Sequence, residues 1–139
     1  MKKVLLCFSF ILFSISLFAQ IGFFRSFSLR EGLSQSSIFC LLQDSKGYIW
    51  LGTDGGGICR FDGKSMITLT HSDGMHNNTV RAFAIDSLDR LWIGHINGMS
   101  LYNGTHFVEL PSALKGAFKD GVRTIHFDKT GVMRVGTSN

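Results

Sequence analysis

The sequence repeats itself with a period of 42 residues, and this period restricts the chain to a few architectures. Several independent positions share the interval, and no stretch has helical periodicity over the dozen or so residues that a helix requires. In each unit an Asp opens a turn, a Gly ends the turn or the following strand, and Trp lies between them in two units. The repeat residues are Asp44, Gly47, Trp50, Gly52, Asp86, Trp92, Gly94, Asp128, Gly131 and Gly136.

Each unit is predicted to form four short antiparallel strands. The run 37–44 is apolar at both alternating sets of positions, which predicts a strand covered on both faces. The next residues, Asp44 to Gly47, have the composition of a hairpin turn. Stacked antiparallel sheets of this kind indicate an all-β fold made of β-propeller blades. A β-solenoid is the alternative, but hairpins require antiparallel pairing, and parallel β-helices have shorter coils.

The repeat also divides the chain into units. We expect blade units at 32–73, 74–115 and 116–139, the last one shorter, and a leading strand at 23–27 that would complete the last blade of a ring. Propellers have about 4–8 blades. About two and a half blades therefore predict an incomplete propeller, a fragment of a longer product, whose first partners are its remaining blades.

The N-terminus has the pattern of a secretory signal peptide. Lys2 and Lys3 precede the apolar run 4–19, which is shorter than the roughly 20 residues of a membrane-spanning helix. We predict a signal peptide at 1–19 and a partial propeller at 20–139, with an uncut anchor as the alternative. Without residues 1–19 the net charge falls from +4 to +2, since two Lys are lost. No basic cluster remains to bind nucleic acid.

The two remaining cysteines are predicted to be free thiols. Cys40 and Cys59 fall on strands that a third strand separates. That separation exceeds the roughly 4.4–6.8 Å between Cα atoms that a disulfide needs.

Residues 23–139 resemble the two-component regulator propeller repeat. The segments Leu42–Thr53 and Ile85–Gly94 carry the resemblance, each with a third-strand segment after it. It implies a periplasmic sensor region of a Bacteroidetes hybrid two-component system, anchored in the inner membrane, that binds oligosaccharides and forms a homodimer in the complete sensor. Three residues depart from the repeat: Asp89 stands in place of Gly, His95 in place of Thr, and Arg134 in place of Trp.

No catalytic, metal-binding or cofactor-binding constellation stands out in the sequence, so we predict a non-enzymatic module. Turn formation accounts for the three repeat Asp residues without acid–base chemistry. A recurring Trp with apolar neighbours is typical of a wedge between blades, although a sugar-stacking platform is the alternative. His71 and His76 lack the further ligands that zinc requires. A kinase module would lie in sequence beyond residue 139.

The loops before the first strand of each blade are the candidate ligand-binding site. They cluster at one mouth of a propeller channel and carry the neutral donors and acceptors that an oligosaccharide uses. The candidate residues are Gln35, Ser36, His76, Asn77 and Asn78. Two other functions stay open: a propeller glycan lyase or hydrolase, and a scaffold propeller of a secretion or surface-assembly system.

Overall fold

The computed structural model describes residues 24–138, which form three antiparallel sheets. Between residues 24 and 138 there is no α-helix, and the three 3-10 helices are single turns, η2 (Leu29–Glu31), η3 (His71–Asp73) and η4 (Ser112–Leu114). The first sheet contains β1 (Ile38–Gln43), β2 (Ile49–Thr53), β3 (Ile58–Phe61) and β4 (Met66–Leu69). The second contains β5 (Val80–Ile85), β6 (Leu91–His95), β7 (Gly98–Tyr102) and β8 (Phe107–Val108). The third contains β9 (Val122–Phe127) and β10 (Met133–Thr137).

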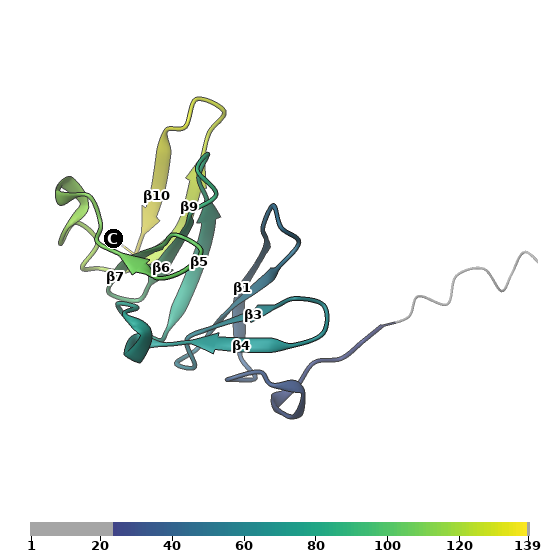
Figure 1. Cartoon of the computed structure of the whole chain (residues 1–139). Coiled ribbons are helices and arrows are strands. Elements are labelled where there is room, and N and C mark those ends of the chain that lie inside the picture. Colours follow the sequence, from purple (N-terminus) through teal and green to yellow (C-terminus); the bar gives the residue numbers. More distant parts are fainter. Residues whose placement is uncertain (1–23, 139) are drawn as a thin grey trace, which may run out of the picture.

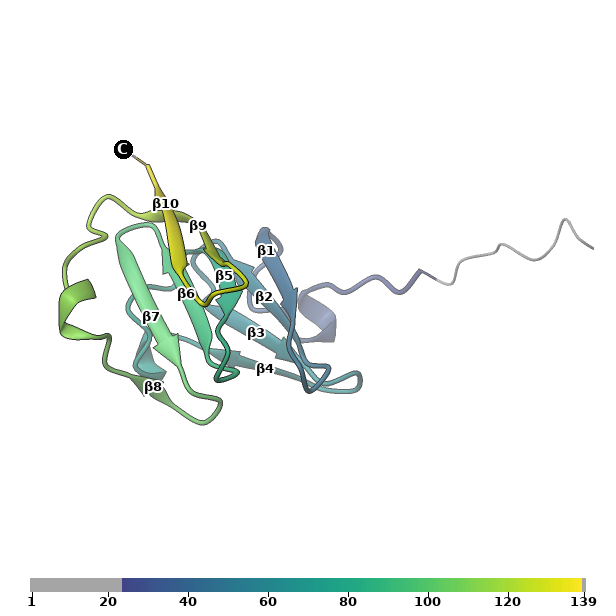
Figure 2. The same ribbon diagram turned by 90° about the horizontal axis from the view of Figure 1, so that it is seen from above.

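The three sheets are arranged as successive blades. They spread like a fan in Figure 1, and Figure 2 shows the same sheets from above. The first strand of each sheet is innermost, because β5 contacts both β1 and β9. Strands follow chain order within each four-stranded sheet. The predicted all-β propeller architecture is therefore confirmed.

Each blade hairpin is closed by the carboxylate of its repeat Asp. In the first blade, Asp44 Oδ1 accepts hydrogen bonds from the backbone N–H groups of Lys46 at 3.0 Å and Tyr48 at 2.9 Å. Gly47 completes the turn with φ of 86°, a left-handed conformation. In the second blade Asp89 takes this place with φ of 59°. Asp can adopt this conformation, which explains why the repeat tolerates the change.

The other carboxylate oxygen of the same Asp binds the repeat Trp. Trp50 Nε1 donates to Asp44 Oδ2 at 2.8 Å, and Trp92 Nε1 donates to Asp86 Oδ2 at 2.9 Å. The repeat pattern alone does not predict this bond. In the third blade Arg134 Nη1 lies 2.7 Å from Asp128 Oδ2. Arg therefore supplies the donor that Trp supplies elsewhere.

The apolar cores lie between the blades. Trp50 is buried in the first core, where it packs edge-to-face on Tyr102 of the second blade at a centroid distance of 5.6 Å. Trp92 is buried in the second core, with its ring 5.9 Å from that of Phe127 in the third blade. Both Trp side chains thus lie between neighbouring sheets. Cys40 and Cys59 are free thiols, as predicted.

The prediction that every first strand is covered on both faces is correct only for the second blade. On one face of β5, Ala82 and Ala84 lie in the second core, and on the other face Phe83 packs against the first core, since β5 has a neighbour on each side. In β1, Phe39 is 42% exposed and Leu41 is 71% exposed. Burial of a blade face depends on the adjacent blade, and only one blade packs against the first blade within residues 24–138.

The predicted leading strand at 23–27 stays a prediction, because the last blade of the ring, which it would complete, is not among the described residues. Residues 24–27 pair with no strand between residues 24 and 138. A strand forms only where a partner accepts its hydrogen bonds. The segment packs through side chains instead: the Phe27 ring contacts the Phe61 ring edge-to-face at 4.8 Å. The predicted signal peptide at 1–19 lies outside the described residues.

Candidate ligand-binding site

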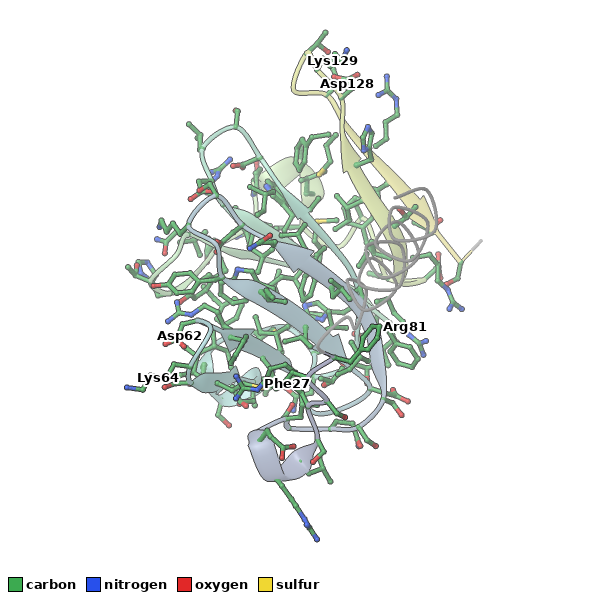
Figure 3. The ribbon with its side chains drawn as sticks, turned by 90° about the vertical axis from the view of Figure 1, so that its right-hand side faces the viewer. Phe27, Asp62, Lys64, Arg81, Asp128 and Lys129 are labelled. Atoms are coloured by element: carbon green, nitrogen blue, oxygen red, sulfur yellow. The ribbon has the colours of Figure 1, made fainter. Side chains whose placement is uncertain are left out.

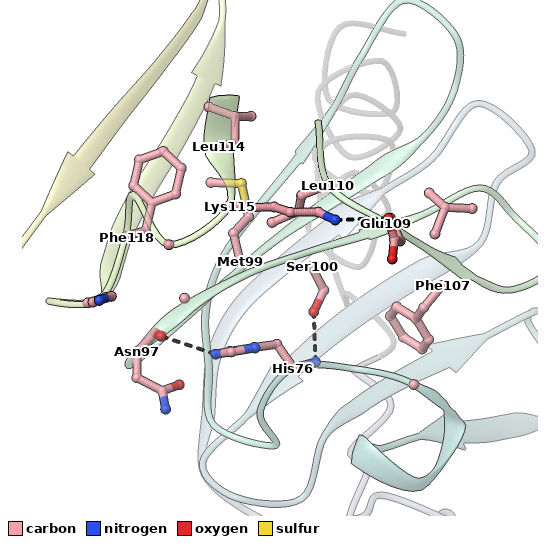
Figure 4. A pocket seen from close by; sticks show the side chains of 15 residues that line it. His76, Asn97, Met99, Ser100, Phe107, Glu109, Leu110, Leu114, Lys115 and Phe118 are labelled. Atoms are coloured by element: carbon pink, nitrogen blue, oxygen red, sulfur yellow. Dashed lines mark hydrogen bonds and ion pairs between the residues drawn. The ribbon is translucent and has the colours of Figure 1, made fainter. Parts of the chain in front are cut away.

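A cavity of about 420 Å³ opens at the outer part of the second blade. Figure 4 shows it between β7, the segment that follows β8, and the loop after η4. Its walls include His76, Asn97, Met99, Phe107, Leu114 and Phe118. These residues come from four separate segments of the chain, so the cavity depends on the folded blade.

The cavity exists because the fourth strand of this blade is short. In the first blade β3 pairs with β4 at four positions, from Ile58 with Leu69 to Phe61 with Met66. In the second blade β7 pairs with β8 only at Leu101 with Val108 and at Tyr102 with Phe107. The chain then leaves the sheet and reaches Pro111, which has no N–H to continue a ladder. Residues 98–100 consequently have no strand partner on their outer edge within the described chain.

The floor of the cavity is apolar and its rim is polar. Met99, Phe107 and Phe118 supply thioether and aromatic surface. At the rim, Lys115 Nζ lies 2.9 Å from Glu109 Oε2, and both side chains are exposed. The hydrogen bond and positive charge of Lys115 lower the pKa of Glu109. A ligand in this cavity would contact apolar surface below and a charged pair above.

A chain of hydrogen bonds joins the rim to a buried histidine. The backbone N–H of His76 donates to Ser100 Oγ at 2.9 Å, and Ser100 Oγ lies 2.9 Å from His95 Nε2. The other end of His76 is fixed, since its Nε2 lies 3.1 Å from the carbonyl oxygen of Asn97 (Figure 4). These bonds hold the His76 ring in place at the cavity wall.

His95 is neutral at neutral pH. Burial disfavours its imidazolium form and, with repulsion from His76, lowers the pKa of His95 to about 4, although the backbone of Thr79 opposes the shift. His95 is fully buried and occupies the repeat position that Thr53 occupies in the first blade. There, Thr53 Oγ1 donates to the Gly57 carbonyl at 2.7 Å. The departure of His95 from the repeat, visible in the sequence, was the signal for this network.

The structure brings one of the five predicted ligand-binding residues to the cavity. His76 lines it, whereas the other four side chains form local hydrogen bonds. Gln35 Oε1 accepts from the backbone N–H of Ser36 at 2.8 Å. Asn77 Oδ1 accepts from the Thr79 N–H, and Asn78 Oδ1 accepts from the His71 N–H, both at 2.7 Å. These bonds shape the loops before β1 and β5.

Within residues 24–138, no three His, Cys, Asp or Glu side chains are grouped so that they could hold a metal ion. Burial raises the pKa of the Cys40 thiol to about 12, which suppresses the reactive thiolate. No helix between residues 24 and 138 has the length and hydropathy to cross a membrane.

Face-to-face antiparallel blades with a 42-residue period define a β-propeller repeat protein. Residues 32–55 match the family model described as two component regulator propeller. Residues 32–55 therefore carry the repeat of the two component regulator propeller, as the sequence predicts.

Three known proteins are similar to this chain over part of their length. Histidine kinase P4 of Formosa agariphila is 39% identical over 79 residues, a match that covers 52% of this chain and 6% of the kinase. The extracellular domain of the hybrid two component system BT3049 from B. thetaiotaomicron has the same fold, with a TM-score of 0.61 at 19% identity over 81% of this chain and 16% of that domain. The extracellular domain of BT4673 has a TM-score of 0.39 at 24% identity, over 78% of this chain and 20% of that domain. This chain thus spans only a small part of each of these proteins.

Proposed function

We propose that this chain is part of the exported sensing region of a two-component signalling protein, with residues 1–19 as its signal peptide. The family repeat and the likeness to a histidine kinase support this assignment. In this proposal the chain binds a ligand in the periplasm, the remaining blades complete the propeller, and an output module outside the chain transmits the signal. The cavity in the second blade is the observation that carries the binding role.

The cavity suits an oligosaccharide. Its volume of about 420 Å³ lies in the range of roughly 300–1,000 Å³ typical of small-molecule sites. Sugar rings have an apolar face of C–H groups and an edge of hydroxyl groups. Phe107 and Phe118 offer surface for the first, and Glu109, Lys115 and the Asn97 side chain offer hydrogen-bonding groups for the second.

Binding without turnover is favoured over glycan hydrolysis. Glycosidases commonly use two carboxyl groups roughly 5–9.5 Å apart. Glu109 is the single acidic residue among the described residues that line this cavity, and it already pairs with Lys115. A sensor needs no second carboxylate, so the composition of the walls supports a sensing role.

Calorimetric titration of the full-length protein with a panel of neutral and acidic oligosaccharides tests the proposal. We expect Phe107→Ala and Phe118→Ala to weaken binding of the cognate sugar by about 5- to 150-fold, because each removes an aromatic contact of about 1–3 kcal/mol. Phe24→Ala is the matched control, since the Phe24 side chain is fully exposed. Release of shortened sugars during the titration would show a lyase or hydrolase instead. Unchanged affinity in both cavity variants would show that the ligand binds elsewhere.

A further inference from the structure

A second, smaller cavity lies where the innermost strands of the second and third blades meet. Its volume is about 50 Å³, and its walls include Arg81, His95, Arg123 and Ser138. A volume of about 10–15 Å³ suffices for one water molecule. The cavity therefore has room for a single small polar group but not for a sugar ring.

Two arginines reach this cavity from equivalent positions. Arg81 is the second residue of β5 and Arg123 the second residue of β9, one repeat of 42 residues apart. The same register holds Phe39 in β1. Because β5 packs against β1 and β9, the repeat places these three side chains on adjacent innermost strands. Two positive charges thus lie close to the inner side of the blades.

The Arg81 side chain has an unused donor. Its Cζ lies 3.9 Å from the centroid of the Phe39 ring, so the face of the guanidinium group stacks on the aromatic ring. The N–H groups of guanidinium point outward in its own plane, which leaves them free for an acceptor. Arg81 Nε is buried and has no hydrogen-bond partner among the described residues. Figure 3 labels Arg81 and shows its position relative to the β9–β10 hairpin tip with Asp128 and Lys129.

The other groups at the cavity complete a cationic site. Arg123 Nε donates to Ser138 Oγ at 3.0 Å, which orients the outer guanidinium group. His95 forms part of the wall. No Asp or Glu lines the described part of this cavity, and neither arginine is in an ion pair between residues 24 and 138. Buried donors without acceptors are costly, so an anion with several acceptor oxygens would be stabilised here.

We propose that this cavity is an oxyanion site, separate from the larger cavity, that takes a carboxylate or sulfate group of an acidic ligand. Arg81 is the inner donor and Arg123 the outer one, and guanidinium groups match the geometry of these planar or tetrahedral oxyanions. The inference goes beyond the proposed function, since it adds a second site, for an acidic ligand, to the sensing region. The Phe39 stack holds Arg81 in the orientation that the oxyanion site requires.

Titration of the full-length protein with D-glucuronate, with inorganic sulfate and with D-glucose tests the oxyanion site. We expect one or both anions to bind more tightly than glucose, and Arg81→Gln to weaken anion binding about tenfold or more. Arg123→Gln should weaken it less, because Arg123 is exposed. Binding of glucuronate alone would assign the carboxylate as the natural group, and binding of sulfate alone would assign the sulfate. Arg30→Gln is the control, since Arg30 is exposed in η2.

Two results would overturn the oxyanion site. One is anion binding no tighter than that of glucose, and the other is equal anion affinity in the wild type and in Arg81→Gln. If Arg81→Gln does not fold, as judged by circular dichroism, Arg123→Gln decides in its place. Neutral oligosaccharides that still bind, and that lose affinity in Phe107→Ala, would uphold the sensing role while the oxyanion site fails. Anion binding that persists without any oligosaccharide binding would uphold the oxyanion site while the sensing role fails.

Discussion

Substitution of Gly94 by Ala tests how closely the second and third blades pack. A Cβ atom at Gly94 would lie 2.5 Å from Val122 Cγ1 and 2.9 Å from Val122 Cβ. Val122 is fully buried in β9, the first strand of the third blade. Its Cβ is attached directly to the backbone, so rotation of the side chain cannot relieve the second contact. The strand or the whole blade must move.

We expect Gly94→Ala to destabilise this interface by about 1–3 kcal/mol, the usual cost of an extra methyl group in a packed core. That corresponds to a rise of about 5- to 150-fold in the opening equilibrium of the amides in β6 and β9. Hydrogen exchange measured by mass spectrometry on the full-length protein reports this locally. Peptides from β3 and β4 of the first blade are the internal control and should exchange at their wild-type rates.

A second substitution makes the test specific. Val122→Ala removes the methyl group that clashes first, at a cost of its own on the order of 1–3 kcal/mol for the lost packing. In the double variant the added and removed methyl groups partly compensate, so the total loss should be smaller than the sum of the two. Strictly additive losses, or wild-type exchange in β6 and β9 of Gly94→Ala, would refute the packing of these blades.

Three further predictions concern buried and charged groups. The pKa of His95 is about 4 in the folded chain against 6.5 ordinarily, so its contribution to stability is complete above pH 6.5 and is lost as pH falls toward 4. This difference in pKa is worth at most about 3 kcal/mol of unfolding free energy. The urea midpoint of His95→Thr should therefore change less with pH over this range than that of the wild type. Trp92→Phe removes the donor to Asp86 and should cost about 1.5–3 kcal/mol in urea denaturation, with Trp50 as the fluorescent reporter. Hydrogen bonds from Thr130 and from the backbone lower the pKa of Asp128 to about 2. Its contribution to stability is therefore present above pH 3.8 and is lost as pH falls to about 2. The urea midpoints of the wild type and of Asp128→Asn should converge over that interval.

The repeat predicts the blades well because the relevant interactions are local. The Asp44 carboxylate binds backbone groups two and four residues away, and the turn residue Gly47 lies between them. Such features recur wherever the short pattern recurs, so the period alone indicates hairpins, strand order and fold class. Coverage of β1 and the leading segment were less predictable. Both depend on which other part of the molecule packs against them, and a local pattern does not contain that information.

The two cavities follow from differences between units rather than from the repeat itself. The larger one opens because β8 is shorter than β4. Its wall is fixed by Ser100, which occupies the repeat position that Cys59 occupies in the first blade. The smaller one is cationic because the second and third blades have Arg81 and Arg123 at the repeat position where the first blade has Phe39. A comparison of aligned units therefore indicates candidate sites that a search for whole motifs misses.

A departure from the repeat is not in itself a sign of function, and Arg134 shows why. It differs from Trp in size, charge and shape, yet it contacts the same carboxylate position that Trp50 and Trp92 contact in the other blades. Its change is accounted for within its own hairpin. Arg81 instead leaves a buried N–H without an acceptor among the described residues. A substitution that leaves such a donor costs free energy unless something binds there, and for this reason Arg81, rather than Arg134, marks a site for a ligand.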